Sequence, residues 1–355
     1  MGRSHIVAVA HTDTDASATF AVFALGSDPL SAKGRVSVPA IENPQWPKHY
    51  RAIAAHGGGG TWLRAESGAR GAVVVRADET GAAKTRVLVG EGPAALHAVG
   101  HWGVVGQGGK VGLIDFSESA PSMKTLHERA DMAGKAYDLF VQHGDWLIAI
   151  DDEVSPVYAD TFTVGASKLK HAEAWTMPGL INGTYYAVAF APTGPRSGTL
   201  FALAQYGIMD GSGHDLAALA VVDGKLAVKP DVLLNGSVST DPPVREEHVS
   251  RRTGKPEKLA WGTAYSDWTD LAIAPDGRLL LSAVGRGLLV LPADFSPTTA
   301  AVQVDVGGDC LDLISDRGRV LVLVGAADSE LVELNPQSLE AKQRYALHGH
   351  YDRLL

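Results

Sequence analysis

Short apolar runs recur along the whole chain, separated by turns rich in Gly, Pro and Asp. The segment from Trp268 to Asp294, WTDLAIAPDGRLLLSAVGRGLLVLPAD, contains an apolar run, a Pro-Asp-Gly turn, a second run, a Gly-containing loop and a third run. The segment from Cys310 to Gln337 repeats this order. Runs of about four to six β-branched residues and leucines, bounded by turn residues, predict β-strands joined by tight turns.

Related first strands begin near positions 49, 95, 136, 184, 268 and 310. Their spacing of roughly 40 residues is that of a four-stranded propeller blade. The N-terminal segment offers three further strands, and HYDRLL at the C-terminus is a lone first strand. We therefore predict an all-β, seven-bladed β-propeller of four-stranded antiparallel blades in one domain, 1–355. Residues 351–355 complete blade 1, so that pairing of the two ends closes the ring. A β-sandwich or two smaller β domains is the alternative.

The connection at 235–261 is the longest irregular stretch, and it is charged. We expect an insertion loop between blades 5 and 6, because the Pro242–Pro243 pair opposes regular structure. Connections of this length are either binding loops or flexible insertions, and both remain open.

The unit WTDLAIAPDGRLLLSA resembles the NHL- and YVTN-type repeats of β-propeller proteins. The resemblance spans most of the chain as a loose pattern. It implies the fold and leaves the chemistry open, because propellers include enzymes as well as pure binding modules.

The net charge of −9 opposes binding to phosphate backbones, so nucleic acid is not an expected partner. The apolar runs are far shorter than the roughly 20 residues of a membrane-spanning helix.

The single cysteine and the strand-like N-terminus fit a cytoplasmic protein, unless a signal peptide has been removed, and we expect a monomer. Walker and Rossmann motifs are absent, so no nucleotide cofactor is expected.

Alignment of the seven first strands places a polar residue from every blade at one position of the ring: Asp352, Arg51, His97, Asp138, Tyr186, Asp270 and Asp312. The preceding position is mostly aromatic or apolar, as the alternation of a strand requires. Four carboxylates around a channel need a cation or hydrogen-bond donors to offset their repulsion. Asp138, Asp270, Asp312 and Asp352 are therefore candidate ligands for Ca²⁺, Mg²⁺ or Mn²⁺. Alternatively, these aspartates accept backbone N–H groups and only shape the strands.

Three residues of the same ring suit catalysis. His97 or Tyr186 would act as general acid or base, and Arg51 would stabilise an anion. This set predicts a lyase or hydrolase acting on a small molecule at one mouth of the channel. The alternative is a non-catalytic scaffold that binds a peptide, protein or glycan there.

A second layer brings Cys310, His49, His348 and His350 to neighbouring blades. Such a set would bind Zn or Cu or hold an activated thiol. The competing interpretation is that Cys310 is a small buried apolar residue and the histidines belong to loops.

Overall fold

The fold is seen in a computed structural model, which describes the following residues: 5–10, 15–42, 48–57, 60–132, 136–151, 158–165, 168–176, 183–191, 198–208, 211–222, 225–226, 231–234, 246–249, 256–259, 268–283, 287–293, 302–325 and 328–355. These residues form β-strands and one short 3-10 helix, η1 (Ala130–Met132). Within these ranges, no helix has the length and apolar character needed to cross a membrane.

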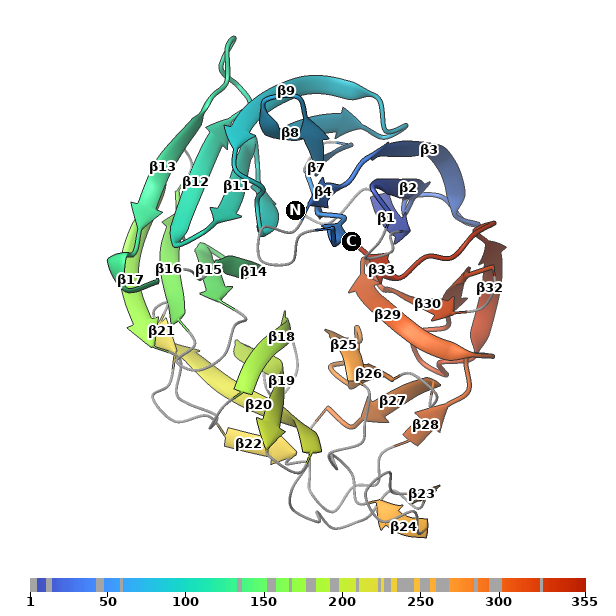
Figure 1. The fold of residues 1–355 in the computed structure, drawn as a ribbon. Coiled ribbons are helices and arrows are strands. Elements are labelled where there is room, and N and C mark those ends of the chain that lie inside the picture. Colours follow the sequence, from blue (N-terminus) through green and yellow to red (C-terminus); the bar gives the residue numbers. More distant parts are fainter. Residues whose placement is uncertain are drawn as a thin grey trace.

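The described residues form seven sheets of four or five strands around a central axis; six of them follow the chain from the axis outward, and blade 1 has the C-terminal strand innermost (Figure 1). Blade 1 contains β33 (Arg353–Leu354), β1 (His5–Ala10), β2 (Ser17–Ala24) and β3 (Ser31–Pro39). Blade 2 contains β6 (Ala54–His56), β7 (Thr61–Gly68), β8 (Gly71–Asp78) and β9 (Ala83–Gly90). Blade 3 contains β10 (Ala95–Val99), β11 (Trp102–Gln107), β12 (Lys110–Asp115) and β13 (Met123–Glu128).

The second half of the ring repeats this order. Blade 4 contains β14 (Tyr137–His143), β15 (Trp146–Asp151), β16 (Tyr158–Val164) and β17 (Leu169–Thr176). Blade 5 contains β18 (Gly183–Phe190), β19 (Thr199–Ile208), β20 (Gly211–Val222), β21 (Lys225–Leu226) and β22 (Asp231–Leu234), and both last strands pair with β20. Blade 6 contains β25 (Trp268–Ile273), β26 (Leu279–Ala283), β27 (Gly287–Leu291) and β28 (Val302–Val304). Blade 7 contains β29 (Asp309–Asp316), β30 (Arg319–Gly325), β31 (Glu330–Leu334) and β32 (Ala341–Ala346).

The two ends of the chain close the ring as the sequence predicts. β33 is the innermost strand of blade 1 and pairs antiparallel with β1, with Leu354 opposite Ala8 and Arg353 opposite Val9. Backbone hydrogen bonds in both directions between Val7 and Leu355, 3.1 and 3.0 Å long, continue this pairing. The all-β propeller prediction is therefore confirmed, and β33 leaves no unpaired inner edge on β1.

Two connections contain structure that the sequence pattern did not predict. The expected first strand of blade 2 is interrupted: β5 (Tyr50–Arg51) pairs with β4 (Ile41–Glu42), and pairing with β7 begins only at Ala54. In the expected insertion at 235–261, β23 (Glu246–Val249) and β24 (Pro256–Leu259) pair with each other. The rest of that insertion lies outside the described residues.

The apolar core lies between neighbouring blades. Separate clusters of buried side chains join blades 1 and 2, 2 and 3, 3 and 4, 4 and 5, 6 and 7, and 7 and 1. Inner strands such as β30 are covered on both faces, with an apolar buried run from Val320 to Val324, whereas outermost strands such as β32 are mostly exposed. Because packing falls between the blades, polar side chains can occupy the axis without disturbing the core.

Candidate functional site

A cavity of about 650 Å³ lies at the axis, and the innermost segments of all seven blades contribute to its lining. Arg51 lines it together with all four aspartates of the predicted ring, which are Asp138, Asp270, Asp312 and Asp352. Arg353 of β33 also lines it and was not among the predicted site residues. The alignment of first strands therefore brings five of its seven ring positions to one cavity.

At two of the inner strands, one residue packs in the core and the next one lines this cavity. Tyr137 and Tyr351 are buried in the core between blades, whereas their successors Asp138 and Asp352 line the cavity. In β29 a bulge between Cys310 and Asp312 interrupts the pairing with β30, and both Leu311 and Asp312 line the cavity. Bulges re-aim side chains in this way at channel rims.

Asp270 and Asp312 form a carboxyl pair across blades 6 and 7. Burial raises the pKa of Asp270 well above its ordinary value, and the negative charge of Asp312 and a hydrogen bond between the two side chains raise it further. The backbone N–H of Leu271 and the charge of Arg353 oppose the rise only partly. Two carboxylates this close cannot both ionise cheaply, so the pKa of Asp270 is held above its ordinary range.

Asp312 is also bound to the backbone. The N–H of Leu313 donates to its Oδ1 at 2.7 Å, and the N–H of Leu354 donates to its Oδ2 at 2.6 Å. Asp312 is buried, so these bonds replace the water that its carboxylate loses. Asp312 therefore accepts backbone N–H groups, as one of the two interpretations of the ring aspartates predicts, and it also lines the cavity.

Arg51 is held in place at the cavity wall. One of its terminal nitrogens, Nη2, donates to the carbonyl oxygen of Pro93 at 2.8 Å. A guanidinium offers five N–H donors in a planar fork, so a bond to the backbone orients the whole group. Together with Arg353, it supplies positive charge to the lining that holds the carboxylates.

The two other residues predicted for acid–base chemistry are placed differently. His97 is not part of the described cavity lining; its Nε2 lies 3.4 Å from Oε1 of Gln142, and its ring is 6.2 Å from that of Phe140, which does line the cavity. Tyr186 falls in β18, but its side chain lies outside the described part of the structure.

The predicted Cys–His cluster is not brought together. Cys310 is fully buried in the apolar layer between blades 6 and 7, because alternation in β29 turns it into that layer. His49, His348 and His350 are all exposed. Among the described residues, these four side chains do not form a group with metal-ligand spacing, and neither do the four ring aspartates.

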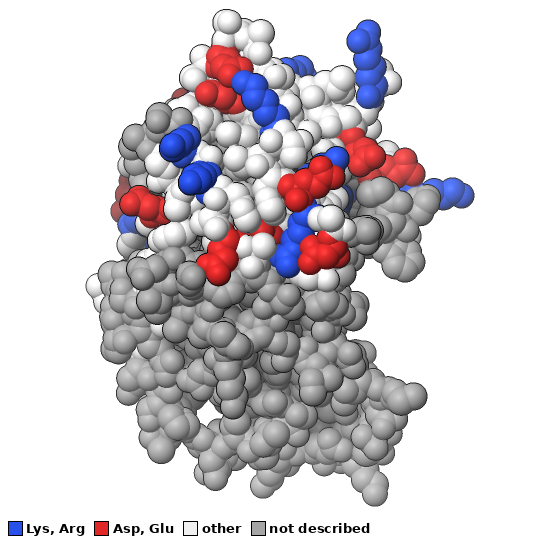
Figure 2. Space-filling view, turned by 90° about the vertical axis from the view of Figure 1, so that its left-hand side faces the viewer, with Lys and Arg blue, Asp and Glu red and all other residues white. Residues whose placement is uncertain are grey.

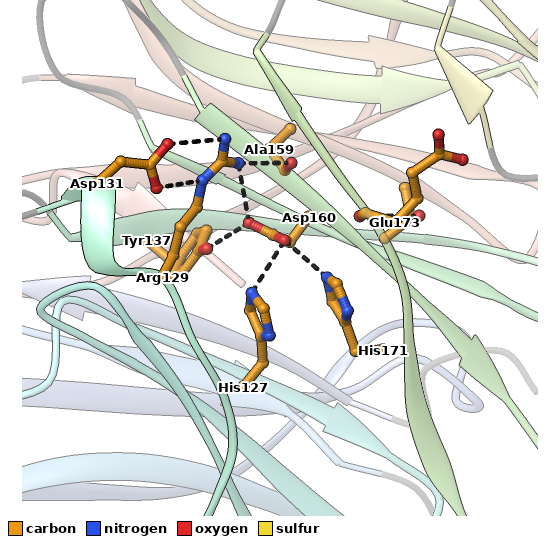
Figure 3. A network of polar contacts seen from close by, with 9 residues as sticks. His127, Arg129, Asp131, Tyr137, Ala159, Asp160, His171 and Glu173 are labelled. Carbon is orange, nitrogen blue, oxygen red and sulfur yellow. Dashed lines mark hydrogen bonds and ion pairs between the residues drawn. The ribbon is translucent and has the colours of Figure 1, made fainter.

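A cluster that the sequence analysis missed lies far from the axis, between blades 3 and 4 (Figure 3). It contains His127 on β13, Asp160 on β16 and His171 on β17, with donor atoms within 4.8 Å of one another. Burial lowers the pKa of His127, and the charge of Asp160 opposes this only in part. The sequence signal is a single histidine in the fourth strand of each of two successive blades, and only an alignment of outer strands would have found it.

The fold and this axial cavity together define the chain as a β-propeller. No protein-family model matches it, and no curated protein sequence matches it. Solved structures show what it is similar to. A protein from Lactobacillus plantarum superposes with a TM-score of 0.60 at 13% identity, over 100% of this chain and 99% of that one.

Two further solved structures show the range of similar proteins. A Bacteroides fragilis protein with the provisional name 6-phosphogluconolactonase gives a TM-score of 0.58 at 13% identity, over 99% and 98% of the two chains. Sqt1 of Saccharomyces cerevisiae gives 0.53 at 10% identity, over 98% of this chain and 86% of that one. At such identities the likeness shows the fold alone.

Proposed function

We propose that the axial cavity binds a small organic molecule and catalyses its hydrolysis, or an elimination, by acid–base chemistry. The observation that carries this proposal is the composition of the cavity wall. One carboxyl group with a raised pKa, that of Asp270, lines the same space as three further aspartates and two arginines. Pairs of titratable groups whose surroundings separate their pKa values are typical of acid–base sites.

Each group has a chemical role in this proposal. Asp270 donates its proton to the oxygen of the leaving group, while Asp138 or Asp352 takes a proton from the attacking water, or from carbon in an elimination. Arg51 stabilises negative charge that develops on the carbonyl oxygen. In this scheme Asp270 replaces His97 as the acid. If a divalent ion of the Ca²⁺, Mg²⁺ or Mn²⁺ type takes part, the carboxylates of Asp138 and Asp352 would hold it, and it would polarise the carbonyl.

Lactones are the first substrates to test. The provisional name of the Bacteroides fragilis structure denotes lactone hydrolysis, in which water adds to a carbonyl and the ring oxygen leaves with a proton. The arginines of the cavity would also bind a phosphate or carboxylate group on such a substrate by donating hydrogen bonds to it.

The experiment measures acid release from a panel of phosphorylated and unphosphorylated sugar lactones, with added Mg²⁺, Ca²⁺ or Mn²⁺ and after chelation. We expect turnover by the wild-type protein, and a loss of about 10²-fold or more in kcat for Asp270→Asn. Asp328→Asn, an exposed change on blade 7, is the control and should retain full activity. Equal rates for the wild-type protein and Asp270→Asn, or no turnover of any lactone, would reject the proposal for this substrate class.

A second candidate function is a binding scaffold for a peptide, protein or glycan. It is favoured by the two backbone hydrogen bonds of Asp312, since they show a ring aspartate serving the fold. Under this alternative, Asp270→Asn and Asp312→Asn lower the melting temperature, and wild-type protein hydrolyses no lactone.

A further inference from the structure

We propose that His127, Asp160 and His171 form a binding site for a divalent transition-metal ion of the zinc type, which joins blades 3 and 4. Two imidazoles and one carboxylate are ligands that Zn²⁺ accepts, and three protein ligands leave one position for water. Imidazole nitrogens favour transition metals over Ca²⁺ and Mg²⁺. This site is separate from the axial cavity and does not depend on the function proposed there.

The donor atoms already converge. Nε2 of His171 lies 2.8 Å from Oδ1 of Asp160, and Nε2 of His127 lies 3.1 Å from the same oxygen. With metal–ligand bonds of about 2.0–2.1 Å in a tetrahedral site, neighbouring ligand atoms are about 3.3 Å apart. The observed spacings are a few tenths of an ångström shorter, and the two rings are parallel. To bind one ion, the rings would therefore have to move outward and tilt so that both Nε2 lone pairs point at it.

The two imidazole rings are arranged to point the same way. They are stacked, with centroids 3.7 Å apart and an angle of 5° between their planes. Phe162 contacts both rings edge-on, with centroids 6.1 Å from His127 and 5.4 Å from His171. Because Phe162 is fully buried, it forms a rigid apolar wall that limits how far either ring can turn.

The third ligand is fixed by groups that contact its other oxygen. The hydroxyl of Tyr137 donates to Oδ2 of Asp160, and Nη1 of Arg129 lies 3.3 Å from Oδ2. Arg129 is in turn paired with Asp131, at 2.8 Å from Nε to Oδ1 (Figure 3). Oδ1 is therefore the oxygen directed to both histidines, and supporting contacts of this kind orient the ligands of metal sites.

The site combines a buried anion with access from solvent. The side chain of Asp160 is completely buried, whereas those of His127 and His171 are 19% and 28% exposed. Nε2 of His127 is itself buried, 3.1 Å from Oδ1 of Asp160. On the face that carries this rim of the ring, acidic and basic side chains are mixed over the described part, so no large field of positive charge repels a cation there (Figure 2).

The test is a Zn²⁺ titration of the full chain by calorimetry after chelator treatment, with Co²⁺ absorption as a second probe. We expect one Zn²⁺ per chain bound at this site, a visible Co²⁺ spectrum typical of tetrahedral nitrogen and oxygen ligands, and no competition from Mg²⁺ for the site. In the same titration, His127→Ala and His171→Ala should each weaken Zn²⁺ binding at least tenfold. Circular dichroism checks that each variant is folded. His127→Gln and His171→Gln replace them if either alanine variant does not fold.

His101→Ala is the matched control. This half-exposed histidine also belongs to blade 3 and also lies near a carboxylate, 3.6 Å from Asp115, but it is not part of the cluster. Its removal should leave the affinity and the stoichiometry unchanged. The proposal fails if the wild-type protein binds no stoichiometric Zn²⁺, or if binding survives both cluster substitutions.

Discussion

The backbone N–H of Leu354 donates a 2.6 Å hydrogen bond to Oδ2 of Asp312, which lies 42 residues earlier in the chain. Leu354 belongs to the inner strand of blade 1, and Asp312 belongs to the inner strand of blade 7. One side chain thus joins the strand that closes the ring to the neighbouring blade. The same carboxylate lines the axial cavity, so closure and the candidate site share a residue.

Asp312→Asn should destabilise the protein. The amide keeps one oxygen, so only one of the N–H groups of Leu313 and Leu354 retains an acceptor, while the other faces an NH₂ group. Leaving a buried donor unsatisfied costs about 1–3 kcal/mol. We expect the melting temperature to fall by a few degrees, measured by circular dichroism, with Asp328→Asn as the control. Equal melting temperatures for the two variants would show that this carboxylate does not support closure.

Asp270 should make stability depend on pH. Its pKa in the folded protein is raised above the ordinary 3.8, so the folded state holds this proton more tightly than the unfolded chain does. Its stabilising contribution is complete below pH 3.8 and is lost as the pH rises through the raised value. In urea unfolding at a series of pH values upward from about 4, wild-type protein should lose free energy of unfolding relative to Asp270→Asn. A difference that stays constant with pH would contradict a raised pKa of Asp270 in the folded protein.

Loss of the hydroxyl should change the free energy of unfolding differently at two buried tyrosines. Tyr137 donates its hydroxyl to the buried carboxylate of Asp160, so Tyr137→Phe should cost about 1.5–3 kcal/mol, as for hydrogen bonds to charged groups. The hydroxyl of Tyr351 is buried with no hydrogen-bond partner among the described residues. Tyr351→Phe should therefore be neutral or stabilising.

Chemical denaturation of the two variants side by side tests this contrast. Both tyrosines are almost fully buried. Each substitution keeps the packed ring and removes only the hydroxyl, so the two variants differ in whether that hydroxyl was hydrogen-bonded. Losses of equal size in both variants would mean that the bond between Tyr137 and Asp160 adds nothing to stability.

The axial lining could be predicted because it follows from a repeat. Each inner strand starts at an equivalent point, so aligning the seven strands superimposes residues that meet around the axis. This is why Asp138, Asp270, Asp312 and Asp352 share one cavity with Arg51. His97 was predicted to face the cavity on the same grounds, but it is not part of the described lining. Its position along the strand does not fix where its side chain points.

The cluster between blades 3 and 4 could not be predicted in the same way. His127, Asp160 and His171 come from the third and fourth strands of two blades, and their order in the sequence has no metal-ligand spacing. Their convergence depends on the register of β16 with β17, which includes a bulge between Thr161 and Phe162. A bulge adds one residue to one strand of a pair, so simple alternation no longer says which side chains face each other.

By itself, the sequence determined the all-β propeller, the closure of the ring by its last strand, and the residues at the start of each inner strand. These follow from periodic patterns that are local, because side chains in a strand alternate and blades repeat. The tertiary structure alone decided that Cys310 packs inside the core away from the exposed histidines, that burial and Asp312 raise the pKa of Asp270, and that two outer histidines meet one buried carboxylate. These depend on distances between blades and on the water that packing removes, and neither is encoded in the spacing of residues along the chain.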